Sequence, residues 1–73
     1  MQRVTLVDEG ESRTFLISGT ETPCQILSHY HMNPDLKIVY LNGQILSRAK
    51  MNTPINITGN VYISVHNKIV IRD

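Results

Sequence analysis

The sequence predicts an α+β domain in which one helix packs across a mixed sheet of four to five strands. Several short runs rich in β-branched residues lie on both sides of a single helix-start signal, and turn residues separate the runs. With 73 residues the chain has room for one small domain, which buries only about 60% of the surface that its unfolded form exposes. Strands on both sides of one short helix therefore favour the α+β class.

The first two runs predict an antiparallel hairpin. Residues 3–7 (RVTLV) are β-branched and partly alternating, and the glycine and acids of residues 8–12 (DEGES) suit a turn. Residues 13–17 (RTFLI) then repeat the strand pattern and place Phe15 and Ile17 on one face. We therefore expect two paired strands within the first eighteen residues.

A helix-start signal follows the hairpin. Thr22 suits the N-cap, Pro23 suits the first helical position, and Gln25 completes a capping box. The apolar positions that follow repeat every three to four residues: Ile26, Leu27 and Tyr30. Because a residue before proline avoids helical geometry, Pro34 places the end of the helix near Met32. The sequence predicts about ten helical residues, which need packing to be stable.

Two further strands are predicted around an Asn-Gly pair. Residues 37–41 (KIVYL) and 44–46 (QIL) flank Asn42-Gly43, and an Asn-Gly pair between apolar runs is a strong hairpin signal.

Residues 47–60 are polar and carry Pro54, so they predict an irregular loop. Its few apolar residues are expected to anchor it to the core: Met51, Ile55 and Ile57. Gly59-Asn60 then turns the chain into the alternating run 61–65 (VYISV). Alternation places Val61, Ile63 and Val65 inward and predicts the last strand.

The order of these elements is that of the β-grasp roll, and two motifs make the resemblance specific. The strings IVYLNGQILSR and ITGNVYISV resemble the Val-Asn-Gly-x-Ile-Val and Gly-Asp-x-Val-x-Ile signals of ThiS/MoaD sulfur carriers and TGS domains. Asn42, Gly43 and Gly59 match these signals, and Asn60 stands where aspartate is usual. The chain also resembles ubiquitin in outline. The resemblance implies a ubiquitin-like β-grasp fold.

The related families imply different activities. Sulfur carriers and conjugated ubiquitin relatives use a C-terminal Gly-Gly, whereas this sequence ends IVIRD after residue 68. TGS domains are accessory modules that contact RNA or protein and need no special terminus. The resemblance therefore favours a binding module over a carrier.

No catalytic or metal-binding constellation is predicted. His29 and His31 are two positions apart, which places them about 200° apart around a helix and prevents them from sharing an ion. Cys24 lies in the first helical turn, but no partner base is indicated, and a small buried residue is the simpler interpretation. We expect neither enzymatic activity nor a cofactor.

Composition bears on location and on the class of partner. The single cysteine excludes an internal disulfide, and no run resembles a signal peptide or a membrane span, so we expect a cytoplasmic protein that does not enter membranes. Residues 1–35 carry two bases and five acids, a charge of −3, whereas residues 36–73 carry five bases and one acid, a charge of +4. The basic half leaves RNA binding open as an alternative.

One sheet face is predicted to bind a partner protein. Period-two reading places Ile38, Tyr40 and Tyr62 opposite the helix-facing Val39, Leu41 and Ile63. Tyr40 resembles in position an exposed aliphatic residue that ubiquitin uses for its partners. Aromatic anchors are typical of protein interfaces. The predicted partner-binding residues are Lys37, Ile38, Tyr40, Arg48, Tyr62 and His66.

The chain divides into a β-grasp domain over residues 1–66 and an apolar tail or extra strand over residues 67–73. The tail contains three β-branched residues, Ile69, Val70 and Ile71. Such a run needs covering. Either the chain's own sheet covers it, or it pairs with a second copy or a partner's strand, as in a homodimer.

Overall fold

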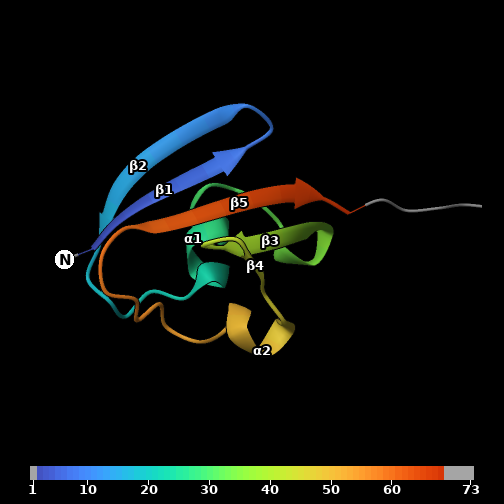
Figure 1. Ribbon diagram of the computed structural model, residues 1–73. Coiled ribbons are helices and arrows are strands. Elements are labelled where there is room, and N and C mark those ends of the chain that lie inside the picture. Colours follow the sequence, from blue (N-terminus) through green and yellow to red (C-terminus); the bar gives the residue numbers. More distant parts are fainter. Residues whose placement is uncertain (1, 69–73) are drawn as a thin grey trace, which may run out of the picture.

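The computed structural model describes residues 2–68, and these form one five-stranded mixed sheet with helices on one side (Figure 1). The elements in order are β1 (Gln2–Asp8), β2 (Glu11–Ile17), α1 (Pro23–His29), the 3₁₀ turn η1 (Pro34–Leu36), β3 (Lys37–Leu41), β4 (Gln44–Ile45), α2 (Arg48–Met51) and β5 (Val61–Asn67). The strand order is β2-β1-β5-β3-β4. Strands β1 and β5 are parallel, and the other neighbours are antiparallel. The predicted fold class is confirmed.

The first hairpin forms as predicted, with strands two residues longer than the sequence runs. Strand β1 pairs with β2 from Gln2 opposite Ile17 to Asp8 opposite Glu11. The turn residues Glu9 and Gly10 both have positive φ, at 46° and 86°. This geometry matches the right-handed twist of the flanking strands and joins them with two residues.

Helix α1 begins as predicted and ends earlier. The Thr22 hydroxyl accepts from the Gln25 N–H at 3.2 Å, and the Gln25 side chain accepts from the Thr22 N–H at 3.0 Å, which completes the capping box. The helix ends at His29, three residues before the predicted end at Met32. The Met32 N–H bonds the Leu27 carbonyl at 2.9 Å, and His31 has a φ of 62°. Those features form a Schellman motif, which ends the helix before the position that Pro34 predicted.

Two short helical segments were not predicted. The stretch 47–60, expected to be irregular throughout, begins with α2, whose N-cap Ser47 accepts from the Lys50 N–H at 3.3 Å. The turn η1 follows Asn33, whose side chain accepts from the Asp35 N–H at 3.0 Å. The predicted anchors of the 47–60 stretch do hold it, because Met51 and Ile55 are buried and Ile57 packs against the core.

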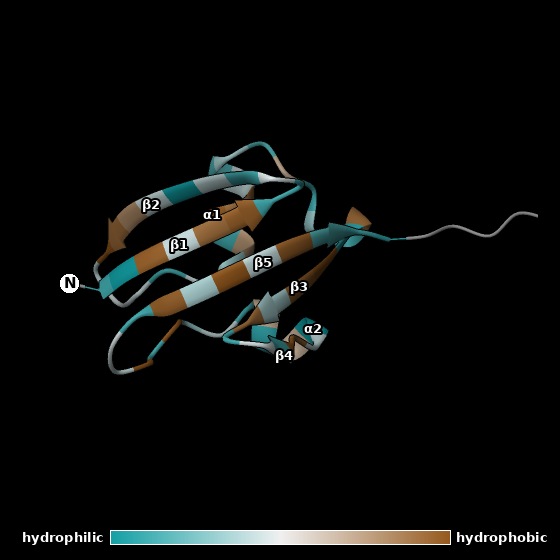
Figure 2. Cartoon of the chain, turned by 45° about the horizontal axis from the view of Figure 1, so that its top comes forward, coloured by the Kyte–Doolittle hydropathy of each residue, from teal (hydrophilic) through white to brown (hydrophobic). Residues whose placement is uncertain are grey.

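The core lies between α1 and the sheet. Alternating apolar and polar residues are visible along β1 and β5 in Figure 2, and the buried ones face the helix: Val4, Leu6, Val61, Ile63 and Val65. The buried apolar residues are Val4, Leu6, Ile17, Ile26, Leu27, Val39, Met51, Ile55, Val61, Ile63 and Val65. The inward side of β5 is therefore the predicted one.

The Asn-Gly turn forms as predicted and has a second role. Asn42 and Gly43 have φ values of 48° and 85° between β3 and β4. The Asn42 N–H bonds the Tyr62 carbonyl at 2.8 Å, and its side-chain carbonyl accepts from the Tyr62 N–H at 2.7 Å. Asn42 thus joins the end of β3 to the start of β5.

None of the helices formed by residues 2–68 is long and apolar enough to cross a bilayer.

Candidate protein-binding face

The outer face of the sheet, opposite α1, brings together four of the six predicted partner-binding residues. Register places Tyr40 opposite Ser64 and Ile38 opposite His66, with Tyr62 on the same face of β5. The structure therefore unites Ile38, Tyr40, Tyr62 and His66. Two neighbours that were not predicted as site residues complete the set, Gly43 and Ser64.

These six residues line a shallow hollow of about 360 Å³, which we call the tyrosine hollow. Tyr62 is 49% exposed at its edge. Its backbone is fixed by both hydrogen bonds to Asn42. Because Gly43 has no side chain, the β3–β4 turn leaves the hollow open beside Tyr40.

His66 is held in a defined position within the tyrosine hollow. Its ring meets the Tyr40 ring edge to face, with centroids 5.5 Å apart and planes at 88°. Its Nε2 lies 2.9 Å from the Ser64 hydroxyl. An aromatic contact and a hydrogen bond together reduce the freedom that the ring would lose on binding.

The strand residues of the outer face carry little charge. Register adds residues of β1, β2 and β4 to this face: Arg3, Thr5, Val7, Ser12, Thr14, Leu16 and Ile45. Among these and the strand residues of the tyrosine hollow, Arg3 and His66 are the basic residues and no acid is present. Depletion of charge around aromatic residues is typical of the centre of a protein interface.

Lys37 and Arg48 do not lie on this face. Lys37 lies two residues before Val39 and so is on the same side of β3 as Val39. Its ammonium donates to the Asn67 side chain at 2.5 Å and lies 3.9 Å from Asp8. The Asn67 amide also donates to the Glu9 carboxylate. Lys37 therefore joins the ends of β1, β3 and β5. Arg48 begins α2 and lines a different hollow.

The remaining predicted features are placed as follows. Cys24 is a free, half-buried cysteine in α1. His29 ends α1 and His31 takes the left-handed position after it. Within residues 2–68, no group of three His, Cys, Asp or Glu side chains is arranged to hold a metal ion. The tail residues Ile69, Val70 and Ile71 lie outside the described residues.

Gly43 and Ser64 were missed as site residues for different reasons. Alternation already placed Ser64 outward, but only the pairing register shows that it faces Tyr40 and reaches His66. Gly43 was interpreted as a turn residue, and its place in the hollow follows from the position of β4 beside β3. A period-two pattern within one strand does not show which strands are neighbours in the sheet.

Comparison with known proteins supports the architecture. No protein-family model and no curated protein matches the sequence. A solved structure, a ubiquitin-like protein from the hyperthermophilic archaea Caldiarchaeum subterraneum, matches with a TM-score of 0.51 at 11% identity, covering 93% of this chain and 95% of that chain. At this identity the likeness concerns the fold, and it does not separate the TGS from the sulfur-carrier type. With the mixed sheet and packed helix, it shows that the chain has the ubiquitin-like β-grasp fold.

Proposed function

We propose that this chain is a non-catalytic, ubiquitin-like binding module that captures a partner protein through the tyrosine hollow. The observation that carries the proposal is a half-exposed tyrosine beside an apolar hollow on a charge-poor sheet face. Like a TGS domain, such a module acts by contact, so an adaptor or inhibitor role suits it.

The chemistry of the tyrosine hollow indicates what the partner offers. Ile38 and the two tyrosine rings favour an aliphatic or aromatic side chain from the partner. The tyrosine hydroxyls, Ser64 and His66 provide hydrogen-bond partners around it. Tyrosine anchors in a desolvated centre dominate many protein interfaces, and truncating one costs about 2 kcal/mol or more in binding.

RNA binding by the basic half is the alternative, and the positions of the bases favour it less. Lys37 is paired with Asp8, and Arg48 lines a second hollow that shares only Ile38 with the tyrosine hollow. Tyr40 and Tyr62 carry stacking surface, but Arg3 is the only lysine or arginine among the strand residues of the outer face in the described part of the chain. Single-strand binding needs both a basic track and stacked aromatics.

Affinity capture with three forms of the protein tests the proposal. The wild type, Tyr40→Ser/Tyr62→Ser and the control Leu36→Ser are immobilised, and retained proteins are quantified by mass spectrometry. Leu36 is 61% exposed, lies in η1 and does not line the tyrosine hollow. The control substitution therefore removes a comparable apolar side chain from another part of the surface. We expect a set of proteins retained by the wild type and the control to be lost from the double variant.

Folding and salt dependence complete the test. Amide NMR spectra show whether the double variant is folded. If it is unfolded because Tyr40 is needed for stability, the single variant Tyr62→Arg is used in place of the double variant. Retention of the same proteins by the folded variants at wild-type yield contradicts the proposal. Raising salt about fourfold weakens RNA binding through about four phosphate contacts by about 10²-fold. A loss of that size, together with sensitivity to ribonuclease, would support the RNA alternative instead.

A further inference from the structure

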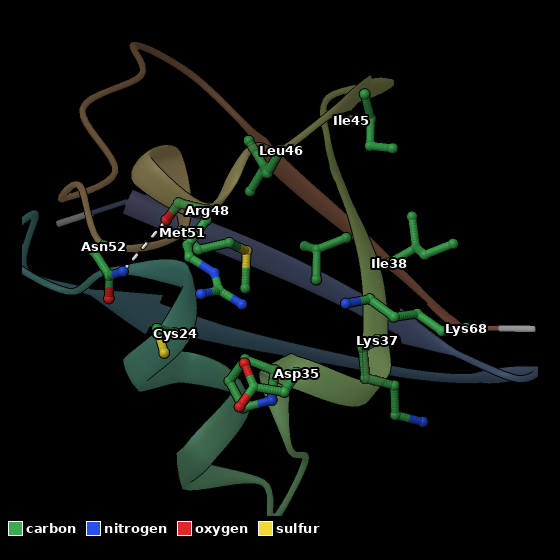
Figure 3. A pocket seen from close by; sticks show the side chains of 12 residues that line it. Cys24, Asp35, Lys37, Ile38, Ile45, Leu46, Arg48, Met51, Asn52 and Lys68 are labelled. Carbon is green, nitrogen blue, oxygen red and sulfur yellow. Dashed lines mark hydrogen bonds between the residues drawn. The ribbon is translucent and has the colours of Figure 1, made fainter. Parts of the chain in front are cut away.

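A second hollow lies at the β3–β4 edge, bounded by α1, η1 and α2, with a volume of about 210 Å³ (Figure 3). We call it the cation hollow. Its apolar lining comes from Ile38, Val39, Ile45, Leu46 and Met51. Ile38 lines the tyrosine hollow as well, so the two hollows adjoin at the edge of β3.

Two cationic side chains turn into the cation hollow. Figure 3 shows the guanidinium of Arg48 and the ammonium of Lys68 directed inward, whereas the ammonium of Lys37 points away. Lys37 is engaged with Asp8 and Asn67. Within residues 2–68, neither Arg48 nor Lys68 forms an ion pair. Two positive charges therefore lie next to an apolar lining without a described counterion.

The backbone of each of the two cationic residues is anchored. The Asn52 amide donates to the Arg48 carbonyl at 3.3 Å, as Figure 3 shows, and buried Met51 fixes α2 against the core. The Lys68 N–H bonds the Leu36 carbonyl at 3.1 Å, which fixes that residue beside η1. Both side chains are exposed, so the fold fixes the two points from which the cations extend toward the cation hollow.

One acid moderates the charge of the cation hollow. Asp35 lines it, and its own N–H is bound by Asn33 at 3.0 Å. Lys37 also lines the cation hollow, but its ammonium is engaged with Asp8, so the two inward cations and one carboxylate leave a net charge of +1. Removing the carboxylate should therefore strengthen the attraction for an anion, and this gives a variant whose effect is opposite to the loss of a cation.

We propose that the cation hollow binds an anionic group, a carboxylate or phosphate, carried on a short apolar stem. The guanidinium of Arg48 presents paired donors that suit both anions, and Lys68 adds a second charge. The aliphatic lining receives the stem. This site shares only Ile38 with the tyrosine hollow, and the proposal does not depend on the function proposed for that hollow.

Matched anions test the site by amide NMR titration. Hexanoate and butyl phosphate carry the stem, whereas acetate and inorganic phosphate lack it. We expect the stemmed probes to bind more tightly than their matched partners and to shift amides around Ile38, Leu46 and Asn52. Arg48→Gln and Lys68→Gln should each lower the affinity about tenfold, as expected for loss of one charge-assisted hydrogen bond. Asp35→Asn should raise it.

Lys50→Gln is the matched control, because Lys50 belongs to the same helix but is absent from the lining of the cation hollow. It should bind as the wild type does. Wild-type affinity in both cation variants, equal reduction by Lys50→Gln, or shifts confined to other surfaces would overturn the proposal, as would an absence of binding.

A second set of probes identifies the source of the anion. Blocked tripeptides with a central glutamate or phosphoserine are titrated under the same conditions as the free acids. Tighter binding of a peptide assigns the site to a side chain of a bound protein, and tighter binding of hexanoate or butyl phosphate assigns it to a free organic anion. Either result supports the shared chemistry only if it is lost in Arg48→Gln.

Discussion

The carboxylate of Glu21 organises the segment between β2 and α1. It accepts hydrogen bonds from the Ser18 hydroxyl at 2.8 Å, the Ser18 N–H at 2.9 Å and the Gly19 N–H at 3.3 Å. The bond from the Ser18 hydroxyl, with smaller contributions from the backbone N–H groups, lowers the pKa of Glu21. The Glu21 carbonyl also accepts from the Ile55 N–H at 3.0 Å. One residue therefore ties two loops together.

Replacing Ser18 by alanine should raise the pKa of Glu21 toward its usual value. A carboxyl with a lowered pKa in the folded state stabilises the fold above its unfolded pKa, and that stabilisation is lost as the pH falls through the folded pKa. Ser18→Ala should therefore make folding less sensitive to acid in that window. Carbon-13 NMR titration of the Glu21 side chain measures the change.

Ser28→Ala serves as the control for this titration. Ser28 is exposed on α1, and its hydroxyl makes no hydrogen bond within the described residues. Its loss should leave the pKa of Glu21 unchanged. If Ser18→Ala also leaves it unchanged, the serine hydroxyl does not hold the charged carboxylate.

At the scale of elements, sequence reasoning succeeded where a pattern repeats. Alternation in 61–65 placed Val61, Ile63 and Val65 correctly inward, and the capping box placed the start of α1 at Thr22. Helix α2 was missed because a four-residue helix buries only Met51 and has no periodic stripe. The end of α1 was misplaced because His31 takes a left-handed geometry more common for glycine.

The candidate site followed the same division. Alternation put Ile38, Tyr40 and Tyr62 on one face, and the structure agrees. Lys37 was grouped with them by proximity in sequence, although its parity matches Val39 and its ammonium reaches Asp8. Contacts between distant segments, such as the bond from Lys68 to Leu36, depend on which strands are neighbours, and local patterns do not show this.

At the scale of elements, we predict that the β3–β4 turn contributes to the stability of the fold through Asn42. Asn42→Ala removes a side chain that tolerates positive φ and bonds the Tyr62 N–H. We expect the free energy of unfolding to fall by about 1–2 kcal/mol. Urea denaturation followed by circular dichroism measures the loss.

Asn56→Ala is a suitable comparison for Asn42→Ala. Asn56 is an exposed loop residue whose side chain makes no hydrogen bond to the described residues. Its replacement should change the unfolding midpoint little. Equal midpoints for both variants would show that the bond to Tyr62 contributes nothing to stability.

At the scale of the whole molecule, two strands from opposite ends of the described chain pair in the middle of the sheet. Strands β1 and β5 pair in parallel, from Val4 opposite Val61 to Asp8 opposite Val65. The side chains of Asp8, Lys37 and Asn67 then join three strand ends. Because β5 also pairs with β3, it connects the first hairpin to the rest of the domain.

Hydrogen exchange should reflect this arrangement. In a small domain with one core, the central amides exchange only when the whole domain unfolds. We expect the slowest amides of β1 and β5 to share one opening free energy, equal to that of global unfolding. Strand β4 has two residues and both are exposed, so it should open locally and exchange faster. NMR-detected exchange over a denaturant series distinguishes the two.

The result to look for is the order of these rates. If the slowest amides of β5 exchange as fast as those of β4, the pairing between β1 and β5 breaks before the whole domain unfolds. Such opening would separate the first hairpin, including Val4 and Leu6, from the core.

The central position of β5 also governs when the protein can fold during its synthesis. Ribosomes add about 5–20 residues per second, so the 59 residues from Asp8 to Asn67 take about 3–12 s to make. Throughout that interval β1 lacks its parallel neighbour, and β3 lacks the strand between them. The nascent chain therefore presents unpaired apolar strands to chaperones and to neighbouring nascent chains. The five-stranded sheet can be completed only after Asn67 has been synthesised.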